Sequence, residues 1–185
     1  MTRKIIPTCV KKIYSLAKRN VYQIWHDRFV EQRCQNEKLI PKYDLQPKHI
    51  QNLKVLLNRE SLLNFLPKNA ICAEIGVNEG DFSKMILQQS SPLKLHLIDA
   101  WGNPARYHDG LKELVRDKFK KEIAQKVVEL NIGYSTAILK EFPDHYFDWV
   151  YLDTDHTYKV TADELAILKD KVKLIRNYHF LIICK

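Results

Sequence analysis

From residue 70 onward, short apolar runs alternate with segments whose apolar residues recur at helical spacing. The runs predict the strands Ile71–Gly76, Leu93–Asp99, Val127–Asn131, Phe147–Asp153 and His179–Cys184. The segments between them predict the helices Asp81–Gln89, His108–Ala124, Tyr134–Phe142 and Tyr158–Lys171. Repeated strand–helix–strand units predict an α/β fold with a doubly wound, Rossmann-like and mostly parallel sheet of about five strands, covered by helices on both faces.

Before residue 66 the pattern is helical instead of alternating. Apolar residues recur at helical spacing between Val10 and Val30, and a second helix is predicted over Gln51–Phe65. We therefore expect residues 1–65 to form a helical extension and residues 66–185 to form the α/β domain. The first helix is expected to pack on its own domain or on a second copy of the chain. An anionic membrane surface or nucleic acid is the alternative partner.

The net charge of +8 lies entirely in this extension. Residues 1–60 contain 13 Lys and Arg against 5 Asp and Glu, whereas residues 61–185 contain 17 of each. No base-reading motif accompanies the basic excess, so we expect no nucleic-acid partner. No apolar run is long enough to span a bilayer, and the four cysteines form neither a metal-binding nor a disulfide pattern. We expect a cytoplasmic protein with free thiols and without a membrane partner.

Glycine is scarce in this chain, and two of its five glycines bound a loop directly after the first predicted strand. This loop, Gly76–Gly80, lies where doubly wound sheets bind ligands, beyond the carboxyl ends of the strands. It lacks the third glycine of the dinucleotide-binding pattern, and it is surrounded by Glu74, Glu79 and Asp81. The negative charge would repel a phosphate and favours a cationic ligand such as S-adenosylmethionine. Asp99 ends the next strand and can accept hydrogen bonds from both hydroxyls of a ribose.

A second polar cluster follows the fourth predicted strand. Asp153, Asp155 and His156 lie within four residues. Their oxygen atoms could hold a divalent cation such as Mg²⁺. Alternatively, His156 could take the proton of an acceptor hydroxyl as a general base. A structural alternative also remains, in which Asp155 caps the following helix and His156 bonds to a neighbouring loop.

Three segments in this order resemble the motifs of class I S-adenosylmethionine-dependent methyltransferases. Ala73–Ser83 resembles the first motif, and Leu97–Gly102 resembles the second, including the tryptophan after the acid. Phe147–Tyr158 resembles the D-G-D-H-x-Y signature of methyltransferase family 24, a group that is similar to the macrocin-type O-methyltransferases. The resemblance covers about residues 60–175.

The resemblance implies that the cofactor is S-adenosylmethionine and assigns residues to its parts. Asp99 would hold the ribose, Trp101 would flank the adenosine, and Ser135 matches the segment beside the adenine. The whole implied cofactor-binding set is Glu74, Gly76, Asn78, Gly80, Asp99, Trp101 and Ser135.

The resemblance also implies methylation of an oxygen on a small-molecule acceptor, a sugar or another small hydroxylated metabolite. Asp153 and His156 would be the catalytic residues, and Asp153 and Asp155 would be the ligands of a metal ion.

The chain departs from the family pattern at three places. Thr154 replaces the glycine between the two aspartates, and Arg176–His179 replaces the usual Gly-Gly turn. The last two strands and the second acidic metal ligand are missing, so we expect a truncated domain with His179–Cys184 as an edge strand. This edge and the N-terminal helices could join two copies of the chain. A catalytically silent domain that binds the cofactor or a partner protein is therefore the alternative to an enzyme, and a nucleotide-dependent oxidoreductase is a weaker one.

Overall fold

The structure is a computed structural model that describes residues 23–24, 26–35, 37–38, 40–42, 44–51, 55–102, 110–174 and 180–183. It divides the chain into two compact units, Met1–Leu53 and Lys54–Lys185. In the first unit, residues 26–35 are helical and α2 (Pro47–Ile50) is a single turn. Most of the predicted helix Val10–Val30 lies outside the described residues, so the helical extension stays a prediction.

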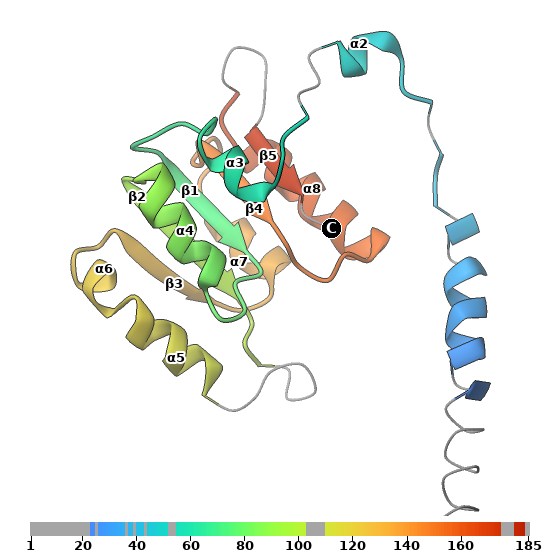
Figure 1. Cartoon of the computed structure of the whole chain (residues 1–185), viewed down its shortest axis with the longest axis horizontal. Helices are drawn as coiled ribbons and strands as arrows, with labels where there is room; N and C mark the ends of the chain where they lie inside the picture. Colours follow the sequence, from blue (N-terminus) through green and yellow to red (C-terminus); the bar gives the residue numbers. More distant parts are fainter. Residues whose placement is uncertain are drawn as a thin grey trace, which may run out of the picture. The chain divides into compact units, whose positions relative to one another are not determined.

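A parallel sheet forms the centre of the second unit (Figure 1). Its strands are β1 (Ile71–Ile75), β2 (Lys94–Asp99), β3 (Val128–Ile132), β4 (Trp149–Leu152) and β5 (Phe180–Ile183). They lie side by side in the order β3-β2-β1-β4-β5. The chain winds outward from β1 to β3 and then crosses back to β4, so the strand order reverses between β1 and β4. The predicted α/β class with a parallel sheet is confirmed.

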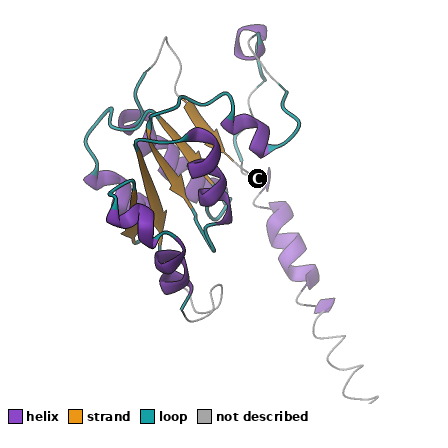
Figure 2. Cartoon of the chain, turned by 60° about the vertical axis from the view of Figure 1, so that its left-hand side comes forward, coloured by secondary structure: helices purple, strands orange, loops and turns teal. Residues whose placement is uncertain are grey.

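Helices cover both faces of this sheet (Figure 2). They are α3 (Arg59–Leu63), α4 (Asp81–Ser90), α5 (Leu111–Lys118), α6 (Lys120–Ala124), α7 (Ser135–Glu141) and α8 (Tyr158–Lys171). Successive residues of β1 point to opposite faces, as strand geometry requires. Cys72 belongs to a buried cluster with Phe82 of α4, whereas Ala73 belongs to a second cluster with Leu139 of α7 and Leu168 of α8. The helices on both faces, which the sequence predicted, are therefore present.

The predicted helix Gln51–Phe65 is wrong in extent, because among its described residues only α3 is helical. Asn58 ends the preceding non-helical stretch and caps α3, since its side chain accepts a hydrogen bond from the Ser61 N–H at 2.8 Å. Leu63 at the end of α3 is fully buried in the core of the second unit. The structural division at Leu53 thus precedes the predicted domain boundary at residue 65, which itself stays a prediction.

The predicted helix His108–Ala124 is two helices in the structure, α5 and α6, which meet at Phe119. Phe119 leaves helical geometry with a ψ angle of 17°, and its ring is buried in the core. Sequence periodicity continues through this residue, so it did not predict the break.

The described helices include none that is both long and apolar enough to cross a membrane. Cys34 is an exposed free thiol, and Cys72 is a buried one.

Candidate functional site

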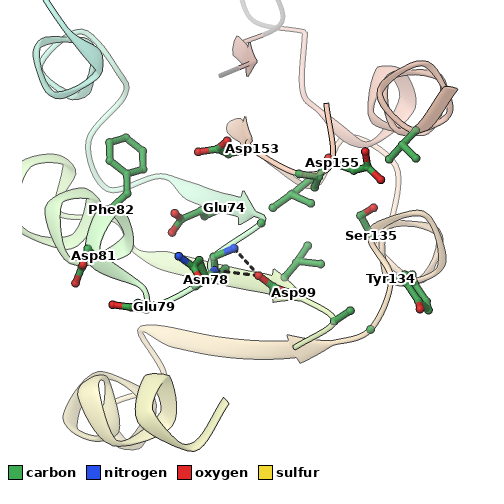
Figure 3. A pocket seen from close by; sticks show the side chains of 18 of the residues that line it. Glu74, Asn78, Glu79, Asp81, Phe82, Asp99, Tyr134, Ser135, Asp153 and Asp155 are labelled. Atoms are coloured by element: carbon green, nitrogen blue, oxygen red, sulfur yellow. Dashed lines mark hydrogen bonds between the residues drawn. The ribbon is translucent and has the colours of Figure 1, made fainter. Parts of the chain in front are cut away.

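A cavity of about 730 Å³ lies at the carboxyl edge of the sheet, within the second unit. The loops that follow β1, β2, β3 and β4 line it. The side chains labelled in Figure 3 include Glu74, Asp99 and Asp153 at the ends of three strands. This edge is where open α/β sheets bind ligands, next to the point where the strand order reverses. The volume is in the range of small-molecule binding sites.

The loop after β1 turns tightly because every second residue adopts a left-handed backbone conformation. The φ angles are 87° at Gly76, 53° at Asn78 and 76° at Gly80. Glycine adopts this region without strain, and asparagine tolerates it better than most residues. A Cβ atom at Gly76 would lie 2.0 Å from the backbone oxygen of Asp153, and one at Gly80 would lie 2.8 Å from the Phe119 ring. Both glycines are therefore required by the packing of the loop itself.

Asp99 holds this loop in place through its carboxyl group. One oxygen accepts hydrogen bonds from the backbone N–H groups of Val77 at 2.8 Å and Asn78 at 3.0 Å (Figure 3). The other oxygen accepts one from the Trp101 N–H at 3.0 Å. A carboxylate offers about four acceptor positions, so three backbone donors leave it room for a ligand hydroxyl. Asp99 therefore organises the loop in addition to lining the cavity.

Glu74 is a buried acid at the bottom of the cavity. Its carboxyl group accepts a hydrogen bond from the Ser83 hydroxyl on α4. Burial raises the pKa of Glu74 to about 8, although the Ser83 hydrogen bond acts in the opposite direction. At pH 7 this side chain is therefore mostly protonated, and a cation placed beside it would favour its ionised form.

Asp81, which follows the loop, differs from Glu74 and Asp99 because a lysine neutralises part of its charge. Lys118 of α5 donates hydrogen bonds to the Glu79 backbone oxygen at 2.6 Å and to the Asp81 carboxyl group at 2.7 Å. This hydrogen bond and the charge of Lys118 lower the pKa of Asp81. Because Glu74 is mostly protonated at pH 7 and Asp81 is paired with Lys118, the negative character that the sequence indicated around the loop rests on Glu79 and Asp99.

Across the cavity, Asp153 joins two cationic or ionisable side chains. Nε2 of His156 lies 3.1 Å from one oxygen of Asp153, and the guanidinium of Arg59 lies 3.8 Å from the other. The Arg59 guanidinium also lies over the Phe82 ring, 4.8 Å from its centre. Asp153 can therefore orient the His156 imidazole, and Arg59 and Asp153 can bind a polar ligand on the same side of the cavity.

Of the ten site residues predicted from the sequence, seven line the cavity and three do not. The cavity is lined by Glu74, Gly76, Asn78, Asp99, Ser135, Asp153 and Asp155. Three others, Gly80, Trp101 and His156, lie next to lining residues. Gly80 is the N-cap residue of α4, the Trp101 indole donates to the Asn78 backbone oxygen at 2.9 Å, and His156 contacts Asp153. The roles of all ten residues stay predictions.

The expected metal ion has no support in the described part of the chain. Asp153 and Asp155 both line the cavity, but no group of three or more His, Cys, Asp and Glu side chains among the described residues could hold a metal ion. The helix after these residues is capped by Thr157, whose side chain accepts a hydrogen bond from the Val160 N–H at 3.4 Å, and not by Asp155.

Sequence reasoning missed two residues of this region. Arg59 was assigned to the extension, although Asn58 before it is a typical helix N-cap and indicates that a helix begins there. Glu164 was overlooked inside α8, where it lies one helical turn before the buried Leu168 and on the same side of the helix. An acidic residue at such an inner position is the signal that could have revealed it.

No curated protein matches the chain. Spermidine synthase from Thermotoga maritima is similar in structure with a TM-score of 0.45 and 17% identity, over 60% of this chain and 37% of that one. The putative methyltransferase SMU.1697c from Streptococcus mutans, in complex with S-adenosylhomocysteine, has a TM-score of 0.47 and 12% identity, over 71% and 69%. The putative methyltransferase yhhF from Escherichia coli has a TM-score of 0.49 and 14% identity, over 74% and 70%.

The chain thus spans little more than a third of the first of these proteins and about two thirds of the other two. A family model described as a methyltransferase domain, Methyltransf_24, matches residues 73–174. This match runs from the middle of β1 through β4 and α8 and includes the cavity-lining loops between them. It covers more than half of the sequence, and the chain therefore belongs to this family of methyltransferase domains.

Proposed function

We propose that this protein is an S-adenosylmethionine-dependent methyltransferase that methylates a hydroxyl group of a small molecule, a sugar or another hydroxylated metabolite. The observation that carries the proposal is the position of two acidic side chains in one cavity, Glu74 at the end of β1 and Asp99 at the end of β2. Together they present carboxyl oxygens to a ligand that needs acceptors for an ammonium group and for ribose hydroxyls. Membership of the methyltransferase domain family supports the same conclusion.

The donor and acceptor groups of the cavity fit this cofactor. Asp99 retains acceptor capacity for a ribose hydroxyl beside its three backbone partners. Glu74 would bind the cationic amino-acid part, and Ser135 and Tyr134 line the cavity beyond β3, where the base would lie. When bound, S-adenosylmethionine supplies a methyl group that a nucleophilic oxygen attacks in line.

The remaining chemistry is the removal of one proton from the acceptor hydroxyl. Nε2 of His156 lies 3.1 Å from a carboxyl oxygen of Asp153, and in the proposed mechanism this contact orients the ring. With the proton on Nε2, the other nitrogen, Nδ1, is the basic atom that takes the proton of the acceptor. Asp153 thus orients the base, and His156 acts on the acceptor.

Calorimetry with S-adenosylhomocysteine tests the cofactor part of the proposal. We expect saturable binding to the folded full-length chain and a clear loss of affinity in Asp99→Asn, which changes one acceptor oxygen to a donor. Asp144→Asn, an exposed aspartate away from the cavity, is the matched control and should bind like the natural sequence. An absence of binding at millimolar concentrations, or tight binding of NAD in its place, would contradict the proposal.

Methyl transfer to a panel of sugars and other hydroxylated metabolites tests the second part. His156→Ala should lower kcat and leave the affinity for S-adenosylhomocysteine unchanged, because the imidazole serves the acceptor alone. Binding of the cofactor without turnover of any hydroxylated acceptor would instead favour a catalytically silent domain.

A further inference from the structure

Glu164 is a fully buried acidic side chain that the reaction outlined above does not use. It lies in α8, and its two carboxyl oxygens accept hydrogen bonds at two different loops: Ser135 is the first residue of α7, where the loop after β3 ends, and Thr154 lies in the loop after β4. The Ser135 hydroxyl, after β3, donates to Oε1 at 2.5 Å, and the Thr154 hydroxyl, after β4, donates to Oε2 at 2.9 Å. Both donors line the cavity. One carboxyl group therefore links two of its walls.

These two loops follow strands that are not neighbours. In the sheet, β2 and β1 lie between β3 and β4, so three interstrand spacings, about 14 Å in total, separate the two strands. Backbone hydrogen bonds of the sheet reach one residue past the strand ends, at Gly133 and Asp153, and the two side-chain hydrogen bonds of Glu164 act beyond these residues. The pair α7 and α8 packs on one face of the sheet and brings Glu164 within reach of both loops.

Thr154 is what allows this link in the present chain. It occupies the position of the glycine in the family signature, and a glycine has no hydroxyl group to donate. Asp153 and Asp155 flank it on either side and line the cavity as well. A hydrogen bond that fixes Thr154 therefore also limits the movement of the two acidic residues beside it.

We propose that Glu164 is a positioning residue. By binding Ser135 and Thr154 together, it sets the distance between two walls of the cavity: the nucleoside wall, which contains Ser135, and the acceptor wall, which contains Thr154. The inference rests on the proposed function for the identity of the ligand, but the link between the loops is a property of the chain itself. A cofactor that touches both walls binds best when their distance is preset, because binding then does not have to order them.

The test compares Thr154→Val, which keeps the branched shape and removes the hydroxyl, with Thr154→Ser, which keeps the hydroxyl. Glu164→Gln is a second variant, and Asp163→Asn, an exposed neighbour on α8, is the control. We expect Thr154→Val to weaken S-adenosylhomocysteine binding about two- to tenfold, the factor that corresponds to one hydrogen bond. Glu164→Gln should act in the same direction, and Thr154→Ser and Asp163→Asn should bind like the natural sequence. All are compared below the onset of unfolding.

Hydrogen exchange of the free proteins separates this proposal from the proposed function. Thr154→Val should exchange faster in residues 133–135 and 153–157, including the segment after β3 that does not contain the substitution. Unchanged exchange in 133–135 would overturn the link, and faster exchange with unchanged affinity would overturn its role in binding. If the natural chain does not bind S-adenosylhomocysteine at all, the proposed function fails, while the exchange data still decide whether Glu164 joins the loops.

Discussion

Glu74 is an acidic residue whose burial opposes folding at neutral pH. Its pKa of about 8 in the folded chain is well above its ordinary value of 4.5. Between these two pH values the folded chain holds a proton that the unfolded chain has released, so the free energy of unfolding falls as the pH rises from about 4.5 to about 8. A carboxyl group buried in this way costs stability at neutral pH.

Glu74→Gln should therefore stabilise the fold at high pH. Glutamine is neutral and keeps an oxygen that can accept from Ser83, so the variant should gain about 2–4 kcal/mol in the free energy of unfolding at pH 8 relative to pH 5. Urea unfolding at the two pH values measures this difference. Glu141→Gln, at an exposed position of α7, should show no such change with pH. Equal effects of Glu74→Gln at both pH values would show that the buried carboxyl group is not the cause.

Asp99→Ala should destabilise the loop after β1 even without a ligand. The substitution leaves the backbone N–H groups of Val77, Asn78 and Trp101 without their acceptor. Since a lost partner of a buried donor costs about 1–3 kcal/mol, and water can reach part of this cavity, we expect a loss of about 2–4 kcal/mol in the free energy of unfolding. Thermal or urea unfolding measures it. A stable variant that binds S-adenosylhomocysteine weakly would assign Asp99 to the ligand alone.

At the scale of elements, most strands and helices were predictable, but the extent of α3 and the break between α5 and α6 were not. The apolar runs located β1 and β2 within one residue at each end, and α8 has the predicted bounds, because burial on both faces and helical spacing both leave a local pattern. The bounds of α3 depend on the Asn58 cap, and the break between α5 and α6 depends on Phe119 packing into the core. Neither effect is visible in periodicity.

The candidate site was predictable only as far as strand ends and loop glycines reveal it. Those positions follow directly from the order of the elements, so Glu74 and Asp99 could be named from the sequence. Arg59 and Glu164 come from helices that pack over the sheet, and their distances to Asp153 and to Ser135 arise only from tertiary packing. A single sequence does not contain this information in a local form.

The tight turn after β1 should not tolerate a side chain at Gly76. Gly76→Ala places a Cβ atom 2.0 Å from the Asp153 backbone oxygen in a left-handed residue, so we expect a loss of more than about 3 kcal/mol in the free energy of unfolding. Gly110→Ala is a matched control, because Gly110 has a similar φ angle of 92° but no described atom within 4 Å of the added Cβ. It should lose only about 1–2 kcal/mol. Similar losses in both variants would mean that the contact with Asp153 is not what requires glycine at position 76.

At the scale of the whole molecule, the first unit contains most of the net positive charge, and the second unit contains the candidate site. Residues 1–53 contain 11 Lys and Arg against 4 Asp and Glu, whereas every residue that lines the cavity lies between Arg59 and Val160. Both buried clusters also belong to the second unit. We therefore expect the chain without residues 1–53 to bind S-adenosylhomocysteine within about twofold of the full-length protein, which calorimetry checks. A large loss of affinity, in a truncated chain that still unfolds cooperatively, would place part of the site in the first unit.

The hydrogen bond from the Trp101 indole to the Asn78 backbone oxygen gives the protein an intrinsic optical probe. Trp149 is fully buried in the core, so its emission reports unfolding, whereas Trp101 is half-buried and bound to a loop that lines the cavity. With Trp25 replaced by phenylalanine, two indoles in different surroundings remain. A ligand that displaces Asn78 changes the surroundings of Trp101 and leaves those of Trp149 unchanged. Fluorescence of one unlabelled protein can then follow binding and folding as separate signals.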